Sequence, residues 1–102
     1  MVDKDLLSIQ EARALVRAAR KAQPEFAQLS QERVDEVVKA VAEAAAAQAE
    51  VLANLAVEDT GFGRPQDKKI KNILASEKVY ACIKDMKTIG VLHSNPTTKV
   101  VE

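Results

Sequence analysis

The sequence contains few of the residues that build disulfides, metal sites and catalytic centres. Its 102 residues include one cysteine (Cys82), one histidine (His93), three aromatic residues and no tryptophan. One cysteine excludes an internal disulfide framework, and one cysteine with one histidine is too few ligands for a zinc site. The net charge is zero, with 15 basic and 15 acidic residues, which argues against a general nucleic-acid binder. We therefore expect no metal site and no nucleic-acid partner.

The chain also lacks long apolar runs. None approaches the roughly 18–20 residues that a membrane span requires, and the N-terminus, with Asp3 and Asp5, does not resemble a secretory signal. Together with the lone cysteine, these absences predict a soluble, cytoplasmic protein that does not enter a membrane. Hydrophobic residues make up 47% of the chain and 17 residues are alanine, which predicts helices packed closely through small side chains.

The first helix is predicted over residues 8–22. Ser8 with Glu11 three residues later forms a capping box, in which each side chain satisfies a backbone N–H at the start of the helix. Pro24 is expected to end the segment, because the residue before a proline is pushed out of the helical region.

The second helix is predicted over residues 30–60, with Ser30 as N-cap and Gly61 as the left-handed residue after its last turn. At 1.5 Å per residue it would be about 45 Å long. Phe62 is expected to pack back on the end of this helix. Its apolar stripe serves either as core or as a docking face for a missing partner, and includes Val34, Val37, Val38, Val41, Ala45, Leu52, Leu55 and Ala56.

The third helix is predicted over residues 65–84, because Pro65 is a favoured first helical residue and Asp67 suits the first turn. Residues 88–92 and 97–101 are β-prone and flank a turn cluster at 93–96. A strand that ends the sequence at Glu102 predicts a piece of a larger fold. The buried side of the third helix is expected to carry Ile70, Ile73, Leu74, Tyr80 and Ile83.

The predicted fold is therefore mainly α, as one segment over residues 1–102: three helices, the second long, and then a short β hairpin or strand pair. Candidate chemistry is sparse. Cys82 is interpreted as a small, semi-buried helix residue and His93 as a surface residue. The turn from Gly61 to Gly63, followed by Lys68 and Lys69, is either an anion site or a helix C-cap. The C-cap is favoured because a helix, not a strand, precedes the glycines. No residue is assigned to a catalytic, cofactor or metal site.

A family resemblance begins at residues 57–72, VEDTGFGRPQDKKIKN. An acidic residue, a threonine and a glycine–hydrophobic–glycine turn precede Asp67-Lys68 and Lys71-Asn72, and this order resembles the CoA-acylating aldehyde dehydrogenases. The family includes acetylating acetaldehyde and sulfoacetaldehyde dehydrogenases and bifunctional aldehyde-alcohol dehydrogenases. The resemblance extends from about Ile9 to Glu102. Later matches, to the bifunctional enzymes in particular, are Ala75-Ser76-Glu77, Lys84-Asp85, Lys87-Thr88 and Gly90-Val91-Leu92.

The resemblance implies the N-terminal part of an α/β oxidoreductase that converts an aldehyde, CoA and NAD(P)⁺ to acyl-CoA and NAD(P)H. The family's catalytic cysteine and most of its cofactor residues correspond to positions beyond 102, and Cys82 does not occupy the nucleophile's place. The 102-residue chain is therefore expected to be inactive alone and to hold no cofactor. The alternative is a non-catalytic helical module for protein–protein interaction.

Partners are expected to be the missing remainder of the enzyme or further copies of this chain as a homo-oligomer. The charge distribution favours contact between copies, because residues 1–63 have a net charge of −4 and residues 64–102 a net charge of +4.

Overall fold

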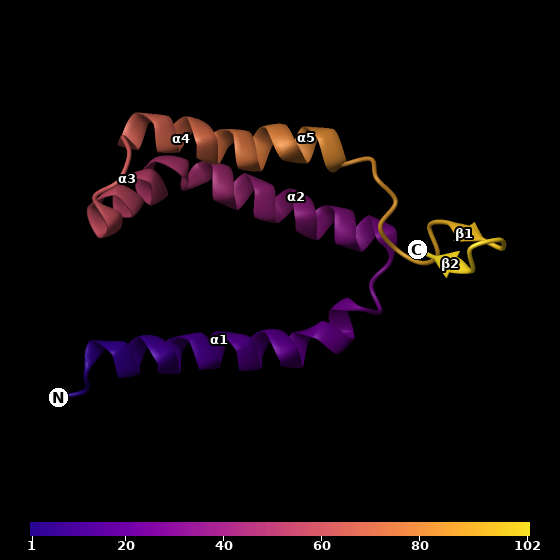
Figure 1. The fold of residues 1–102 in the computed structure, drawn as a ribbon, viewed down its shortest axis with the longest axis horizontal. Helices are drawn as coiled ribbons and strands as arrows, with labels where there is room; N and C mark the ends of the chain where they lie inside the picture. Colours follow the sequence, from indigo (N-terminus) through magenta and orange to yellow (C-terminus); the bar gives the residue numbers. More distant parts are fainter.

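The structure is a computed structural model that describes all 102 residues. Its elements are α1 (Lys4–Phe26), α2 (Gln31–Ala47), α3 (Ala49–Thr60), α4 (Pro65–Ile73), a π-helical turn η1 (Leu74–Lys78), α5 (Val79–Ile83), β1 (Ser94–Asn95) and β2 (Val100–Val101). The helices α2 and α3 run antiparallel to the continuous rod α4–η1–α5, and these elements are called here the helical hairpin (Figure 1). The prediction of a mainly α chain followed by a short antiparallel strand pair is confirmed.

Helix α1 extends beyond the predicted range 8–22 at both ends. It begins after Asp3, and the Ser8 hydroxyl donates to the carbonyl oxygen of Lys4 at 3.0 Å instead of capping the helix. Pro24 lies inside the last turn. The prediction that Pro24 ends the helix is wrong, because a missing N–H near the C-terminus removes one helical hydrogen bond and only a short stretch follows it.

The predicted helix 30–60 is two helices, α2 and α3, bent by 61° at Gln48, which has φ −100° and ψ 6°. Both predicted ends are confirmed. The Ser30 hydroxyl accepts from the backbone N–H of Arg33 at 3.3 Å, and Gly61 is left-handed with φ 69°. No single helix of the chain is long and apolar enough to cross a membrane, although α2 and α3 together meet that length and composition across their bend.

Gly61→Val is expected to destabilise the chain by about 1–3 kcal/mol, because a β-branched residue is strained at positive φ. A Cβ atom at this position would meet nothing within 4 Å, so the cost is backbone strain alone. Thermal unfolding followed by circular dichroism measures it. Gly61→Asn is the matched control and should lose less, because asparagine tolerates the left-handed region. Equal melting of the valine variant and the parent would contradict the prediction.

The helical hairpin is held together by small residues. Ala49 and Ala53 on α3 are the most buried residues of the chain, with 2% and 1% of their surface exposed, and they lie where α3 packs on α4. The side-chain amide of Asn72 donates to the carbonyl oxygen of Ala49 at 3.0 Å. The hydroxyl of Ser76, itself 7% exposed, donates to the carbonyl oxygen of Asn72 at 2.7 Å. Small side chains therefore let the two arms approach closely.

The predicted buried side of the third helix is partly wrong. Ile70 and Leu74 are 69% and 57% exposed, whereas Ile73 and Tyr80 are half-buried, as predicted. Ile83 is 42% exposed but lies on the side toward α2. The face toward α2 and α3 carries the smaller residues Asn72 and Ser76 instead, and the π-helical turn, which the sequence did not predict, shifts the helical period after residue 73. The start at Pro65 and the end near residue 84 agree with the prediction.

The strand pair is displaced from its predicted place. Residues 88–92 form no strand, and β1 falls inside the predicted turn cluster. The new turn follows β1: the Asn95 side-chain oxygen accepts from two backbone N–H groups of the turn at 3.0 and 3.2 Å. Asn95 therefore nucleates a turn three residues later than predicted, because its side chain bonds to the backbone that follows it.

The chain is extended. Its radius of gyration is 18.5 Å, whereas a compact domain of this length has about 13 Å. Its accessible surface is 8798 Å², and a folded monomer of 11.1 kDa would expose roughly 5,700 Å². Only three hydrophobic residues are buried, while 24 large hydrophobic residues are exposed. The secondary structure is complete, but most of the apolar surface has no partner within the chain.

Candidate functional site

The residues with potential chemistry do not form a centre. Cys82 lies on α5 and is exposed, so the prediction that it is semi-buried is wrong. The face of α5 toward α2 is occupied by Tyr80 and Ile83 instead. His93 is exposed, as predicted, and its backbone pairs with Glu102 beside the strand pair. No group of three or more His, Cys, Asp or Glu residues could hold a metal ion.

The glycine turn has the geometry of a helix C-cap. The N–H of Gly61 donates to the carbonyl oxygen of Val57 at 2.8 Å, and the N–H of Phe62 donates to the Thr60 hydroxyl at 3.2 Å. Phe62 is 77% exposed, so the prediction that it packs back on α3 is wrong. Two of the N–H groups that an anion would need are therefore already used.

The neighbouring lysines are also engaged. The Lys69 ammonium lies 2.9 Å from a Glu50 carboxylate oxygen, and the Lys68 side chain covers Gly63, where an added Cβ would lie 2.9 Å from Lys68 Cε. A dinucleotide fingerprint requires a strand before its glycines, and here α3 precedes them. The residues of this turn therefore do not fit the NAD(P) that the family resemblance implies.

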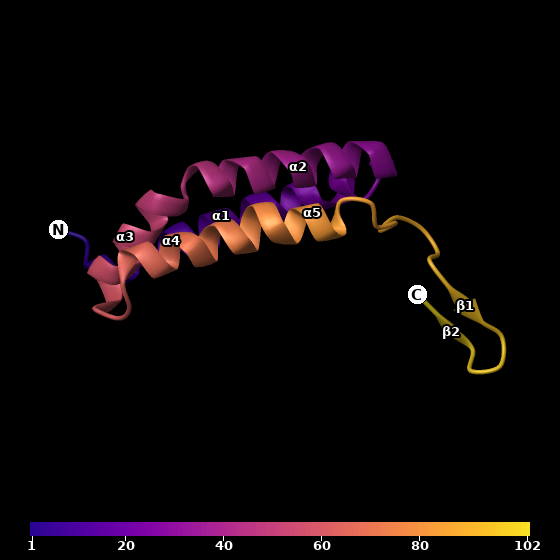
Figure 2. The same ribbon diagram turned by 90° about the horizontal axis from the view of Figure 1, so that it is seen from above.

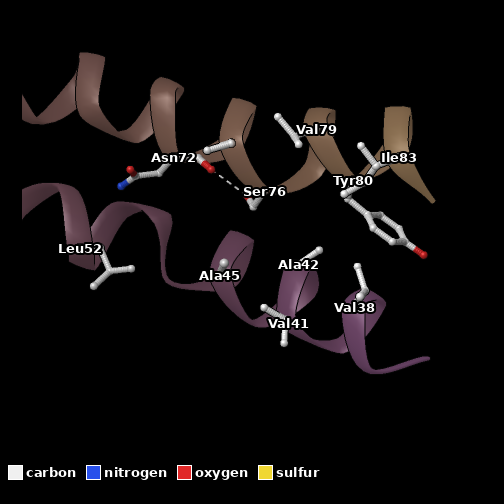
Figure 3. Close-up of a pocket in the computed structure, with 11 residues that line it drawn as sticks. Val38, Val41, Ala42, Ala45, Leu52, Asn72, Ser76, Val79, Tyr80 and Ile83 are labelled. Atoms are coloured by element: carbon white, nitrogen blue, oxygen red, sulfur yellow. Dashed lines mark hydrogen bonds between the residues drawn. The ribbon is translucent and has the colours of Figure 1, made fainter. Parts of the chain in front are cut away.

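The candidate site is an open apolar groove between α2 and the start of α3 on one side and the α4–η1–α5 rod on the other (Figure 3). Its volume is about 300 Å³, and nine of its eleven lining residues are hydrophobic. In Figure 3, Val38 and Tyr80 lie at one end and Leu52 at the other. The lining residues are Val38, Val41, Ala42, Ala45, Leu52, Asn72, Ala75, Ser76, Val79, Tyr80 and Ile83.

The groove offers apolar contact and little else. Val41 is 63% exposed, and Leu52 is 50% exposed. The polar groups of Asn72 and Ser76 are turned to backbone partners, and no charged residue lines the groove. It therefore provides no nucleophile or base, and suits the burial of another apolar surface. Val38, Val41, Ala45 and Leu52 belong to the stripe predicted from the sequence, and Tyr80 and Ile83 to the predicted buried side of the third helix. Asn72, Ala75, Ser76 and Val79 were not predicted, because the π-helical turn shifts the helical spacing around them.

A second feature joins the helical hairpin to the strand pair. The side-chain oxygen of Gln31 accepts from the backbone N–H groups of Thr88 and Ile89 at 2.8 and 3.0 Å. Its amide nitrogen donates to the Thr88 hydroxyl at 2.9 Å and to an Asp35 carboxylate oxygen at 2.8 Å. One glutamine thus fixes the connector that follows α5. The sequence gives no signal for this contact, because it joins residues 57 and 58 positions apart.

Gln31→Ala is expected to release the connector without unfolding the helices. The loss of the bonds to Thr88 and Ile89 should lower the local stability by about 1–2 kcal/mol. Amide hydrogen exchange at Thr88 and Ile89 should then become roughly tenfold faster. Gln28→Ala, a change at an exposed position just before α2, is the matched control and should leave both amides unchanged. Unaltered exchange in Gln31→Ala would show that the connector is held by other contacts.

The fold and the groove define a class of molecule: a helical segment with an exposed apolar face. The solved structure of an acetylating aldehyde dehydrogenase from Geobacillus thermoglucosidasius matches 95% of this chain with a TM-score of 0.76 and 41% sequence identity, and the chain covers 22% of it. No protein-family model matches the chain.

The sequence relatives belong to the same group of enzymes as the solved structure. The chain is 46% identical over 90 residues to the bifunctional aldehyde-alcohol dehydrogenase AdhE of Escherichia coli (strain K12), which is 88% of this chain and 10% of that protein. It is 38% identical over 87 residues to the succinate-semialdehyde dehydrogenase (acetylating) of Clostridium kluyveri, which is 85% of this chain and 19% of that protein. The resemblance predicted from the sequence is therefore confirmed: the chain is similar to one segment of the acetylating aldehyde dehydrogenases and spans a tenth to a fifth of their length.

Proposed function

We propose that this chain is the N-terminal structural segment of a cytoplasmic, NAD(P)-dependent, CoA-acylating aldehyde dehydrogenase. The reaction of that enzyme is aldehyde plus CoA plus NAD(P)⁺ to acyl-CoA plus NAD(P)H. The observation that carries the proposal is 46% identity to AdhE over 88% of the chain. The shared fold, with a TM-score of 0.76 to an acetylating aldehyde dehydrogenase, supports it.

Within such an enzyme the segment has a scaffolding role. Its glycine turn is closed by Val57, Thr60 and Lys68 and does not fit a dinucleotide. Binding of NAD(P) and CoA is therefore assigned to the parts of the enzyme outside this segment. NAD(P) would accept the hydride there, and CoA would accept the acyl group. The contribution of this chain is the helical hairpin and its exposed apolar face.

A chimera tests the proposal. Residues 1–102 replace the matching segment of the Geobacillus enzyme, and NADH formation is followed with acetaldehyde, CoA and NAD⁺. We expect activity within about tenfold of the parent, because a segment of the same fold should leave the catalytic groups of the parent enzyme in their positions. The matched control carries Ala53→Leu in the same chimera and should lose activity. A folded, NAD-binding chimera with no activity would contradict the proposal.

The isolated chain is expected to show no dehydrogenase activity, because covalent aldehyde oxidation needs an activated nucleophile and Cys82 is a free, exposed thiol. Purified chain is assayed with acetaldehyde, CoA and NAD⁺ for NADH absorbance. Activity that survives Cys82→Ser would show a different nucleophile in this chain. Activity that disappears in Cys82→Ser would make Cys82 that nucleophile, and either result would overturn the scaffolding role.

The second candidate is a free-standing helical module that binds other proteins, which the open groove favours. The scaffolding role and the free-standing module predict different activities for the chimera. A free-standing module has no reason to restore aldehyde oxidation, and it should remain a stable monomer on its own.

A further inference from the structure

A second pocket lies where α2, α5 and the connector of residues 84–93 meet, next to the end of the groove that Val38 and Tyr80 mark in Figure 3. Its volume is about 240 Å³, which is below the range for drug-sized ligands and suits a smaller molecule. Unlike the groove, it combines charged and hydroxyl-bearing side chains with apolar ones. This connector pocket is lined by Asp35 and Val38 of α2, Tyr80 and Ile83 of α5, and Lys84, Met86 and Thr88 of the connector.

The connector forms one wall of this pocket because Gln31 holds it beside α2. Figure 2 shows the connector leaving α5 near the start of α2, and the strand pair projecting away from the helical hairpin. The Gln31 side-chain oxygen accepts from the Thr88 N–H at 2.8 Å, and its amide nitrogen donates to an Asp35 carboxylate oxygen at 2.8 Å. An ionised carboxylate only accepts hydrogen bonds, so Asp35 directs the amide nitrogen toward itself and leaves the oxygen to the connector. Two residues of the pocket are thus joined through Gln31.

The connector pocket contains charges of both signs that do not neutralise each other. The half-buried Asp35 and the exposed Lys84 both line it, but neither belongs to any of the ion pairs in the chain. The Lys84 ammonium and the Tyr80 hydroxyl also make no hydrogen bond within the chain. The pocket therefore offers a negative group, a positive group and a free hydroxyl to a ligand.

These groups select the charge of the ligand. A ligand that carries only a negative charge would lie close to Asp35, and one that carries only a positive charge would lie close to Lys84. A ligand with both charges satisfies both side chains, and such complementarity gives specificity more than affinity. Val38, Ile83 and Met86 supply an apolar surface beside the charges, which suits a short aliphatic group.

We propose that the connector pocket binds a small zwitterion with an aliphatic side chain, such as an aliphatic amino acid. Its ammonium group binds Asp35, its carboxylate binds Lys84, and its side chain contacts Val38, Ile83 and Met86. Because Thr88 closes the pocket only while the connector is held beside α2, the ligand also stabilises the connector in this position. The site is independent of the proposed function, and its test requires no dehydrogenase activity.

Three matched probes test the charge of the ligand. L-leucine, 4-methylpentanoate and 3-methylbutylamine carry similar aliphatic groups but differ in having both charges, the negative charge or the positive charge. The full 102-residue chain is titrated with each probe, and the backbone amides of Lys84, Met86 and Thr88 are followed by NMR. We expect a dissociation constant for L-leucine on the order of 1 mM, the affinity expected for so few atoms. The singly charged probes should bind roughly tenfold more weakly, because each lacks one charge-assisted contact.

No shift of these amides with L-leucine would overturn the site, and equal affinities of the three probes would overturn the zwitterion. The titration is repeated at two protein concentrations. A midpoint that follows the concentration of the chain instead of that of the probe would overturn the site, because it would report self-association.

Two substitutions test the charged residues separately. Lys84→Met keeps an unbranched side chain and Asp35→Asn keeps an oxygen that accepts from Gln31, so each removes mainly a charge. Each should weaken L-leucine binding roughly tenfold. Lys84→Met should bind 3-methylbutylamine better than the parent does, and Asp35→Asn should bind 4-methylpentanoate better. Lys71→Met is the matched control, since Lys71 is exposed on α4 and does not line the pocket. Unchanged preferences in both variants would overturn the assignment of the two charges.

Amide hydrogen exchange tests the role of the connector. A ligand that binds only the closed connector slows its opening by linkage, about tenfold at a ligand concentration ten times the dissociation constant. We expect this slowing at Thr88 and Ile89 with L-leucine, and unchanged exchange in the turn 61–64. Gln31→Ala should weaken L-leucine binding, because it releases one wall of the pocket. Binding of L-leucine with unaltered exchange at Thr88 and Ile89 would overturn the part of the connector in the site.

Discussion

Replacing Ala53 by leucine is expected to separate α3 from α4 and to abolish cooperative unfolding of the helical hairpin. Ala53 is 1% exposed where the two helices pack, so added methyl and methylene groups have no space. Overpacking typically costs about 1–3 kcal/mol, which is a large share of the stability of a chain with three buried hydrophobic residues. Separation of α3 from α4 should also break the hydrogen bond from the Asn72 side-chain amide to the carbonyl oxygen of Ala49.

The measurement is urea unfolding followed by circular dichroism. Ala44→Leu on α2 is the matched control, because Ala44 is exposed and leucine is almost as good a helix former as alanine. The control should unfold like the parent, with a sigmoidal transition. If Ala53→Leu and the parent unfold at the same urea concentration, α3 and α4 do not pack through Ala53.

The isolated chain is expected to self-associate, because the 24 large exposed hydrophobic residues have no partner within the chain. Light scattering coupled to size exclusion should give masses above 11.1 kDa that rise with concentration. Val41→Asp should weaken association by roughly tenfold or more, since burial of one valine contributes about 1.5 kcal/mol or more.

Val2→Asp should leave the association constant unchanged, and circular dichroism must show that both variants keep their helices. A single 11.1 kDa species across a wide concentration range would contradict the prediction.

The ends of the helices could be predicted because their causes are local. Ser30 caps α2 through a residue three positions away, and Gly61 ends α3 through its own backbone angle. Pro65 likewise opens α4 by fixing one torsion. The bend at Gln48 could not be predicted, since every residue around it is compatible with a straight helix.

The strand pair and the groove could likewise be predicted only in part, because contacts between residues far apart in the sequence determine them. Thr88 and Ile89 are β-prone, but their backbone N–H groups donate to the side-chain oxygen of Gln31, which is 57 and 58 positions away in the sequence. These groups are therefore not free to pair with another strand. The α2 stripe, with Tyr80 and Ile83 opposite it, could be predicted because a regular helix keeps its period. Ser76 could not, because its hydrogen bond to Asn72 lies at a π-helical turn that no pattern of residue types revealed.

The order of contacts along the chain has a consequence for its synthesis. The arms of the helical hairpin are joined by a turn of four residues, 61–64, and α3 and α4 pack directly on either side of it. Such local contacts form fast. We therefore expect the hairpin to close while later residues are still inside the ribosome, starting at the turn and progressing toward α2 and α5. The Gln31 hydrogen bonds to residues 88 and 89 form last. The strand pair therefore takes its orientation only after the helices that precede it have folded.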